Sequence, residues 1–265
     1  MSPTEKTLDQ RVSTVTYLGH ASILIETNGV RILTDPILRD QISFLRRTTP
    51  TVDKAHYSDI DMVLISHLHY DHLDTYSLRM MDGPYKVVIP HGAAPLLERV
   101  GITGYQEVQI GDKVQVGSIS IDVTYADHTR SRHPMGLTAD SLGFVISGDI
   151  NVYYPGDTRL FPEMASLTDL ELDVALLPVW GWGYHRGKMH MGPKEAAQAL
   201  DLLKPRVAVP IHWGTFIPWG LKWLKPAFYY YPPIEFAGYA KKMAPQVDVR
   251  ILIPGEQVKI TENRE

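Results

Sequence analysis

Three histidines and two aspartates lie within the eight residues from His67 to Asp74, directly after the short apolar run DMVLIS at 61–66. A β-branched run of this length is typical of a strand buried in a sheet. His67 and His69, two apart on an extended chain, project to the same side and can hold one ion together. If the chain then turns into a helix, Asp71 and His72 point elsewhere, toward a second ion beside the first.

Imidazole nitrogens and carboxylate oxygens suit zinc, manganese or iron. The chain of 265 residues has no cysteine, which excludes thiolate zinc fingers, iron–sulfur clusters, disulfide scaffolds and cysteine nucleophiles. The same absence favours a catalytic over a structural metal site. The alternative is a polar loop that happens to be rich in histidine, and its place at the end of a buried strand disfavours that reading.

Further candidate ligands follow other apolar strands. His128 comes after SISIDVTYA, Asp157 after NVYYPG and His212 after RVAVPI. Taken singly, each is as readily a hydrogen-bonded structural residue. Taken with the first motif, they complete the donor sets for two ions at one sheet edge.

The rest of the chain predicts many strands with interspersed helices. Asn28-Gly29 between SILIET and VRILTD indicates a two-residue hairpin. GPKEAAQALDLLK at 192–204, with Pro193 in the first turn, predicts an amphipathic helix, and VRILIPG at 249–255 a late strand. With 44% apolar residues and no repeat or linker, residues 1–265 are expected to form one layered α/β domain.

Charge and hydropathy bear on partners and location. Lys plus Arg number 26 and Asp plus Glu 30, a net charge of −4, which disfavours nucleic-acid coating. The polar N-terminus lacks a secretory apolar stretch, and no apolar run approaches the roughly eighteen residues that span a bilayer. A soluble cytoplasmic protein without a membrane span is expected, acting on a small molecule; a homo-oligomer is left open.

The pattern H-x-H-x-D-H with a later His, Asp and His resembles the metallo-β-lactamase superfamily, and the order and spacing match over nearly the whole chain. Within it, the sequence looks most like the branch of L-ascorbate-6-phosphate lactonase and N-acylphosphatidylethanolamine phospholipase D. The segments that carry this closer likeness are LGHAS (18–22), LTDP (33–36), YPGDT (154–158), MHMGPKEA (189–196) and PIHWGTF (210–216). One departure is Leu73-Asp74, which stands where glyoxalase-type members have a glycine pair.

The resemblance implies a four-layer αββα sandwich of two mixed β-sheets flanked by helices. It implies two divalent metal ions, zinc first, with manganese or iron as alternatives. The implied ligands are His67, His69 and His128 for the first ion, Asp71, His72 and His212 for the second, and Asp157 as a bridge.

Such a pair of ions can hold a bridging hydroxide that attacks an ester, lactone or phosphodiester in a small, anionic substrate. Asp71 and His190 are the candidate catalytic residues. His190 precedes the helix at Gly192-Pro193, whose N-terminus favours an anionic group, so it can bind phosphate or protonate a leaving group. The alternative is a capping or packing histidine.

Three further residues are candidates for contacting substrate or orienting a ligand. His20 lies in a loop that the resemblance puts near the cleft, or is held by backbone hydrogen bonds alone. Asp35 either orients a ligand or sets the turn before Pro36. Asp74 either orients a ligand histidine or caps the next helix. The histidines expected not to be ligands are His56, His91, His133 and His185.

Other readings stay open. A nuclease is disfavoured by the charge balance. A di-iron oxidoreductase of this superfamily carries glutamate where this chain has His69. A non-catalytic metal-binding module is disfavoured by seven candidate ligands, more than one structural ion needs. The aromatic stretch 213–231 is read as core or subunit interface, with a wall for an acyl chain as the alternative.

Overall fold

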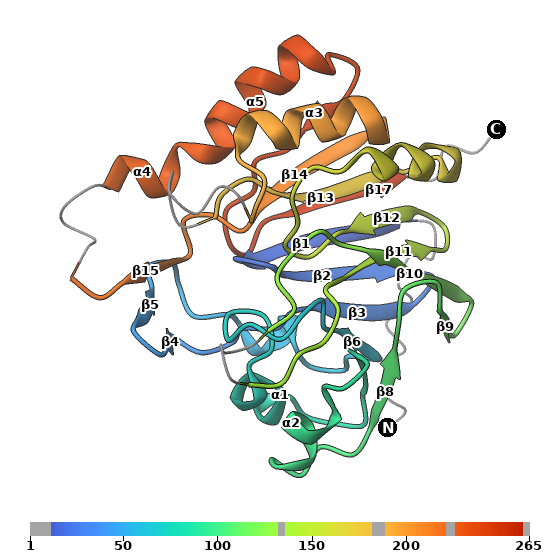
Figure 1. The fold of residues 1–265 in the computed structure, drawn as a ribbon, viewed down its shortest axis with the longest axis vertical. Helices are drawn as coiled ribbons and strands as arrows, with labels where there is room; N and C mark the ends of the chain where they lie inside the picture. The colour runs from blue at the N-terminus through green and yellow to red at the C-terminus, as the bar shows by residue number, and fades with distance from the viewer. Residues whose placement is uncertain (1–11, 132–135, 182–188, 221–225, 262–265) are drawn as a thin grey trace, which may run out of the picture.

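The structure is a computed structural model that describes residues 12–131, 136–181, 189–220 and 226–261. In this part of the chain, two seven-stranded sheets lie face to face with helices on their outer faces (Figure 1). The first sheet runs in the order β17 (Gln257–Thr261), β1 (Val12–Gly19), β2 (Ser22–Thr27), β3 (Val30–Thr34), β6 (Met62–Leu64), β7 (Lys86–Pro90), β8 (Tyr105–Val108). The second runs β16 (Asp248–Val249), β14 (Val207–Ile211), β13 (Val174–Pro178), β12 (Asn151–Tyr154), β11 (Leu142–Ser147), β10 (Ile119–Tyr125), β9 (Lys113–Val116).

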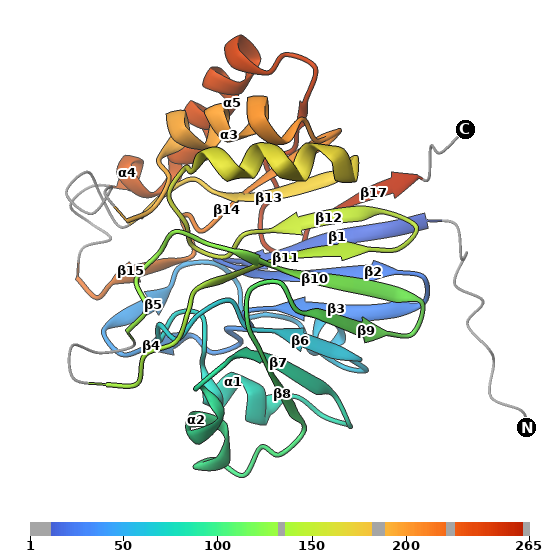
Figure 2. The same cartoon turned by 45° about the vertical axis from the view of Figure 1, so that its right-hand side comes forward.

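Helices cover both outer faces, as Figure 2 shows from a second direction. The second sheet is covered by α3 (Pro193–Leu203), α5 (Pro232–Met243) and the 3₁₀ helix η2 (Pro162–Leu170). The first is covered by α1 (Thr75–Met80) and α2 (Ala94–Glu98). The predicted four-layer αββα sandwich with two mixed sheets is confirmed. No helix in the described part of the chain is long and apolar enough to cross a bilayer.

The strands of the first sheet are apolar on both faces because each face is covered. Ile23 and Ile25 of β2 pack toward the second sheet, in one cluster with Phe144 of β11. Leu24 between them belongs to the outer cluster with Leu78 of α1. Successive residues of a strand point to opposite faces, so this alternation assigns each side chain to one of two cores.

Each sheet brings the C-terminal ends of several strands to one edge. β3, β6 and β7 are parallel neighbours, as are β12, β13 and β14. β1 reaches β3 through two antiparallel pairings, and β10 reaches β12 in the same way, so each runs with those strands. Loops that follow these strands therefore gather at the same edge, where ligands bind in open α/β sheets.

Several predicted elements agree with the structure and some do not. Asn28 and Gly29 both have positive φ, 52° and 74°, as the predicted hairpin turn requires. The predicted helix at 192–204 is α3. The strand predicted at 249–255 is wrong beyond Val249: Arg250 donates its amide to the Ala208 carbonyl, and the chain then crosses to the other sheet.

The sequence did not predict three elements near the aromatic stretch. A small sheet pairs β15 (Phe216–Pro218), β5 (Leu45–Arg47) and β4 (Gln41–Ile42), to the left in Figure 1. The helices α4 (Pro226–Tyr230) and α5 follow it, both beginning at a proline. η1 (Lys54–His56) is a further short 3₁₀ helix.

Candidate metal centre

The candidate residues from the sequence come together where strands of both sheets end. Asp35 follows β3, and His67 to His72 follow β6. From the second sheet, His128 follows β10, Asp157 follows β12 and His212 follows β14. Residues that are 145 positions apart in sequence, His67 and His212, thus lie in one site because the strands before them end at one edge.

The first cluster is formed by His67, His69 and His128, each of which offers a ring nitrogen within 4.8 Å of the others. His69 Nδ1 lies 3.0 Å from His67 Nε2 and 3.2 Å from His128 Nε2. The His69 ring is inclined by 79° to that of His67 and by 81° to that of His128. Three steeply inclined rings whose nitrogens meet at one point have the form of a metal-binding tripod.

The outer nitrogen of each ring in this cluster contacts an oxygen atom. These contacts are His67 Nδ1 with Ser66 Oγ at 2.9 Å, His69 Nε2 with Thr129 Oγ1 at 3.2 Å, and His128 Nδ1 with the Met189 carbonyl at 2.8 Å. A carbonyl only accepts, so His128 carries its proton on Nδ1 and presents the Nε2 lone pair inward. Partners of this kind fix the tautomer of metal-binding histidines.

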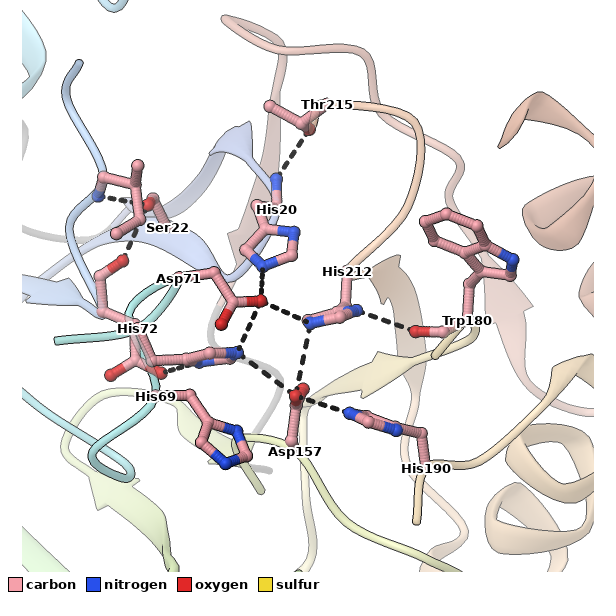
Figure 3. A network of polar contacts seen from close by, with 12 residues as sticks. His20, Ser22, His69, Asp71, His72, Asp157, Trp180, His190, His212 and Thr215 are labelled. Atoms are coloured by element: carbon pink, nitrogen blue, oxygen red, sulfur yellow. Dashed lines mark hydrogen bonds and ion pairs between the residues drawn. The ribbon is translucent and has the colours of Figure 1, made fainter. Parts of the chain in front are cut away.

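The second cluster is formed by His20, Asp71, His72 and His212, again with donor atoms within 4.8 Å of one another (Figure 3). Asp71 Oδ2 lies 3.0 Å from His20 Nε2, 3.7 Å from His212 Nε2 and 4.0 Å from His72 Nε2. The His212 Nδ1 proton is donated to the Trp180 carbonyl over 2.7 Å. The Nε2 atoms of His72 and His212 therefore face the carboxylate.

Asp157 reaches both clusters, and Figure 3 shows its carboxylate facing the rings of His72, His212 and His190. Its Oδ2 is 3.2 Å from Nε2 of both His72 and His212, and 4.0 Å from His128 Nε2 in the first cluster. It also accepts a hydrogen bond of 3.0 Å from His190 Nε2. Asp157 is 2% exposed, so its charge acts on these rings with little solvent screening.

His20 enters the second cluster through its backbone as well as its ring. Its amide donates to Thr215 Oγ1 over 2.7 Å, and its carbonyl accepts from the His212 amide over 2.8 Å. His20 and His212 both have left-handed backbones, with φ of 58° and 60°. Such conformations are costly for side chains with a Cβ and persist where the surroundings enforce them, often at functional sites.

The donor set and its surroundings fit divalent cations. Among the described residues, His72 Nε2 and Asp157 Oδ1 are buried without a hydrogen-bond partner. Buried polar atoms of this kind are rare and call for a partner, such as an ion or ordered water. His69 Nδ1 lies at hydrogen-bond distance of the inner nitrogens of His67 and His128, and a cation held by these three residues would satisfy their lone pairs.

Burial and charge divide the histidines into two groups. Burial lowers the pKa of His128 to about 4 and that of His67 well below its usual value, so both are neutral at pH 7. Burial alone would lower the pKa of His212, but the Asp157 carboxylate outweighs it and raises the pKa to about 9. Burial is likewise outweighed at His72, where Asp157 and Asp35 raise the pKa. In the metal-free protein, protons in the second cluster thus balance its carboxylates.

The metal-free protein is expected to be most stable near pH 6.5. The pKa of His212 is raised to about 9, so the stability it contributes is complete below about 6.5 and is lost as the pH rises through 9. The pKa values of His20 and His128 are lowered to about 3 and 4, so their contribution is lost as the pH falls from about 6.5 toward those values. Urea unfolding of metal-free protein at pH 5, 6.5 and 9 measures how the unfolding free energy falls on the acid side and on the alkaline side of this optimum, the acid limb and the alkaline limb.

His212→Asn is the matched variant for this test. Asparagine tolerates the left-handed backbone at this position and does not titrate. The variant is expected to make the alkaline loss of stability shallower, with the part due to the raised pKa of His72 remaining, and to keep the acid limb. Stability of the metal-free parent that rises from pH 6.5 to 9 would contradict the assignment.

Gly156, next to Asp157, allows the Asp157 loop to approach Ser66. Gly156 has φ of +62°, and a Cβ there would lie 2.5 Å from Ser66 Cβ. We expect Gly156→Ala to destabilise the fold by ~1–2 kcal/mol from the left-handed backbone and a further ~1–3 kcal/mol from the collision. Gly29→Ala is the control, because Gly29 has φ of +74° with no atom within 4 Å. Equal losses of unfolding free energy in the two variants would show that the Ser66 contact is unimportant.

Two helix ends carry contacts that bear on the sequence expectations. Asp74 contacts no ligand histidine in the described structure: it caps α1 by accepting from the Ser77 amide, and it pairs with Arg39 at 2.8 Å. The capping alternative is therefore the one observed. At the N-terminus of α3, Glu195 accepts a hydrogen bond from the Gly192 amide over 2.6 Å, and the anion site expected at this helix end stays a prediction.

Asp35 and His190 both contact the clusters. Asp35 accepts from His72 Nδ1 over 2.6 Å, so it orients a candidate ligand, and its φ of 32° also sets the turn before Pro36. His190 is 8% exposed and stacks against Gly181, where a Cβ would lie 2.6 Å from the imidazole. Its Nδ1 has no hydrogen-bond partner among the described residues.

The histidines expected not to be ligands lie elsewhere or outside the described residues. His56 and His91 belong to none of the described metal-binding groups, while His133 and His185 fall outside the described residues. The aromatic stretch divides: Trp213, Phe216 and Tyr229 are buried, whereas Trp219 is 74% exposed. Trp223 also falls outside the described residues.

Several contacts of the site were missed from the sequence. The Trp180 and Met189 contacts are made by backbone carbonyls, which leave no mark in the residue type. Tyr154 donates its hydroxyl to Asp35 from the opposite sheet. Its signals were its place three residues before Asp157, on a strand that ends at the site, and its membership of the segment YPGDT.

Known proteins include relatives of this chain. The sequence profile described as the beta-lactamase superfamily domain matches residues 30–213. A UPF0173 metal-dependent hydrolase of Methanopyrus kandleri is 33% identical over 248 residues, covering 91% of this chain and 97% of its own.

Solved structures share the fold. Igni18, a metallo hydrolase of the archaeon Ignicoccus hospitalis, aligns with a TM-score of 0.73 at 28% identity, over 94% of this chain and 98% of its own. An isothiocyanate hydrolase from Delia radicum gut bacteria gives the same TM-score at 18% identity, over 94% and 99% of the two chains. That second likeness concerns the fold alone.

Proposed function

The chain belongs to the UPF0173 family of the metallo-β-lactamase superfamily, and from this premise we propose that it is a hydrolase whose two clusters each hold one divalent ion. The superfamily expected from the motif is confirmed. The narrower branch of lactonase and phospholipase D stays a prediction. Relatives of this family are named metal-dependent hydrolases, which supports the reaction class.

The observation that carries the proposal is the convergence of inner ring nitrogens on two neighbouring points with one carboxylate between them. His67, His69 and His128 would hold one ion, and Asp71, His72 and His212 the other, with Asp157 in reach of both. Nitrogen and oxygen donors favour zinc, with manganese or iron as alternatives. Ions bound there would activate a water for attack at neutral pH and polarise the scissile group.

The chain's own residues supply positioning and proton transfer. His20 donates to Asp71 and so holds its Oδ2 toward His212. His190, with one nitrogen on Asp157 and the other without a described partner, is placed to give a proton to a leaving group. We propose an ester, lactone or phosphodiester as the bond cleaved, in a small anionic substrate that the bound cations would attract.

Metal counting combined with a hydrolysis panel tests the proposal. Elemental analysis of purified protein should give two zinc, manganese or iron ions per chain. Mild chelation should remove both the ions and the hydrolysis of a panel of aryl esters, lactones and bis-aryl phosphodiesters. One ion or none, after resupply at neutral pH, would contradict the two-ion site. Two ions without turnover of any panel member would favour a metal-binding module.

A further inference from the structure

We propose that Asp35, Ser66 and Tyr154 form a relay that fixes one histidine in each cluster, and that Tyr154 is a positioning residue for the whole centre. The inference rests on the proposed metal-binding function. It assigns a role to a tyrosine that is buried in the second sheet and touches no candidate ligand by the described contacts.

Asp35 is the centre of the relay and is fully buried. Its Oδ1 accepts the Ser66 amide over 2.8 Å. Its Oδ2 accepts from Ser66 Oγ over 2.5 Å, from His72 Nδ1 over 2.6 Å and from the Tyr154 hydroxyl. Four donors surround one carboxylate, which leaves it little freedom to rotate.

The proton order along the relay follows from donor and acceptor chemistry. A carboxylate only accepts, so the single hydroxyl hydrogen of Ser66 points to Asp35. Ser66 Oγ then has only lone pairs for His67 Nδ1, 2.9 Å away, and the ring must donate there. His67 therefore carries its proton on Nδ1 and offers Nε2 to the first cluster.

The same carboxylate acts directly on the second cluster. His72 donates its Nδ1 proton to Asp35, so Nε2 is the nitrogen left for a metal. One carboxylate thus determines the tautomer of His67 through a hydroxyl and that of His72 through a direct bond. Two ions held by these rings would share one source of orientation.

Tyr154 donates a hydrogen bond to the Asp35 carboxylate from the opposite sheet. It lies at the end of β12 in the second sheet, whereas Asp35 follows β3 in the first. Burial, then the Asp35 charge, raises the Tyr154 pKa well above its usual value, so the hydroxyl remains a donor. Without that donor, Asp35 loses its only hydrogen bond from the opposite sheet among the contacts described.

Tyr154→Phe is the first test, with Tyr153→Phe as matched control. Tyr153 is the preceding residue of β12, is equally buried, and its hydroxyl makes no described hydrogen bond to the site. Zinc affinities are measured by competition with a chromophoric chelator. Loss of an outer partner of this kind lowers metal affinity ~10–100-fold. We expect a loss in that range for both ions in Tyr154→Phe and less than twofold in Tyr153→Phe.

Ser66→Ala separates the two arms of the relay. It removes the hydroxyl between Asp35 and His67 and leaves the Asp35–His72 bond. The affinity of the first cluster for its ion should therefore fall, while that of the second cluster stays within about twofold of the parent. Nuclear magnetic resonance of the zinc-loaded protein gives a second readout. The Nδ1 protons of His67 and His72 should exchange slowly in the parent, both faster in Tyr154→Phe, and only that of His67 faster in Ser66→Ala.

The outcomes distinguish this inference from the proposed function. Parent protein that binds no metal overturns the function itself. Parent protein that binds two ions, with Tyr154→Phe unchanged in affinity and Nδ1 proton exchange, overturns the relay alone. Equal losses in Tyr153→Phe and Tyr154→Phe would assign the effect to packing of the strand and also overturn it.

Discussion

Asp157→Asn is expected to abolish hydrolysis and to weaken metal binding by more than the ~10–100-fold that loss of an outer partner costs. The substitution keeps the shape of the side chain and removes its charge. In the parent, Asp157 Oδ2 lies 3.2 Å from the inner nitrogens of both His72 and His212 and 3.0 Å from that of His190. The variant leaves these rings without the carboxylate they share and removes an anionic donor from between the clusters.

Asp127→Asn is the matched control for this variant. Asp127 directly precedes a candidate ligand, His128, but its carboxylate, which is 24% exposed, pairs at 2.7 Å with the half-exposed Arg159. A surface pair contributes ~0–1 kcal/mol, so the control should retain its metal and its turnover. Turnover of Asp157→Asn within tenfold of the parent, measured with metal in excess, would exclude a direct role for Asp157.

Strand ends and short motifs were predictable because they are local. The hairpin at Asn28-Gly29 needs positive φ at two successive positions, a requirement that asparagine and glycine meet. His67 and His69 could be placed together because an extended chain repeats every two residues. Their meeting with His128 was implied by the resemblance; the strand-end position suggested only a shared edge.

Contacts between distant segments were less predictable. Asp74 had two equal readings, and the choice was made by Arg39, 35 positions earlier, and by the Ser77 amide. At the start of α3, Glu195 folds back onto the Gly192 amide, a contact that the sequence pattern did not show, and the anion site expected there stays a prediction. A pattern shows that a helix begins, and only the local rotamer shows what caps it.

The second cluster gained a member that the ligand set implied by the resemblance did not include. His20 was placed near the cleft, yet its ring lies within hydrogen-bond distance of Asp71. Its orientation depends on Thr215 and on the His212 amide, both almost 200 residues away. Long-range backbone hydrogen bonds of this kind have no periodicity, so no sequence pattern reports them.

Removal of metal is expected to abolish hydrolysis reversibly and to lower thermal stability while the fold survives. An ion present at 100 times its dissociation constant stabilises the folded state by ~2.7 kcal/mol. At about 2–4 °C per kcal/mol for a chain of roughly this size, chelation should lower Tm by ~5–11 °C per ion. The metal-free fold persists because protons on His72 and His212 balance Asp71 and Asp157.

The pH dependence of the fall in Tm on chelation distinguishes a cation site from an ordinary buried ion-pair network. The pKa of His212 is raised to about 9, so near pH 9 the metal-free protein is losing the proton that replaces the cation, whereas at pH 6.5 it retains it. The Tm difference between metal-loaded and chelated protein should therefore be larger at pH 9 than at pH 6.5. Calorimetry at both pH values measures it. A difference that shrinks at pH 9 would show that the cation does not take the place of these protons.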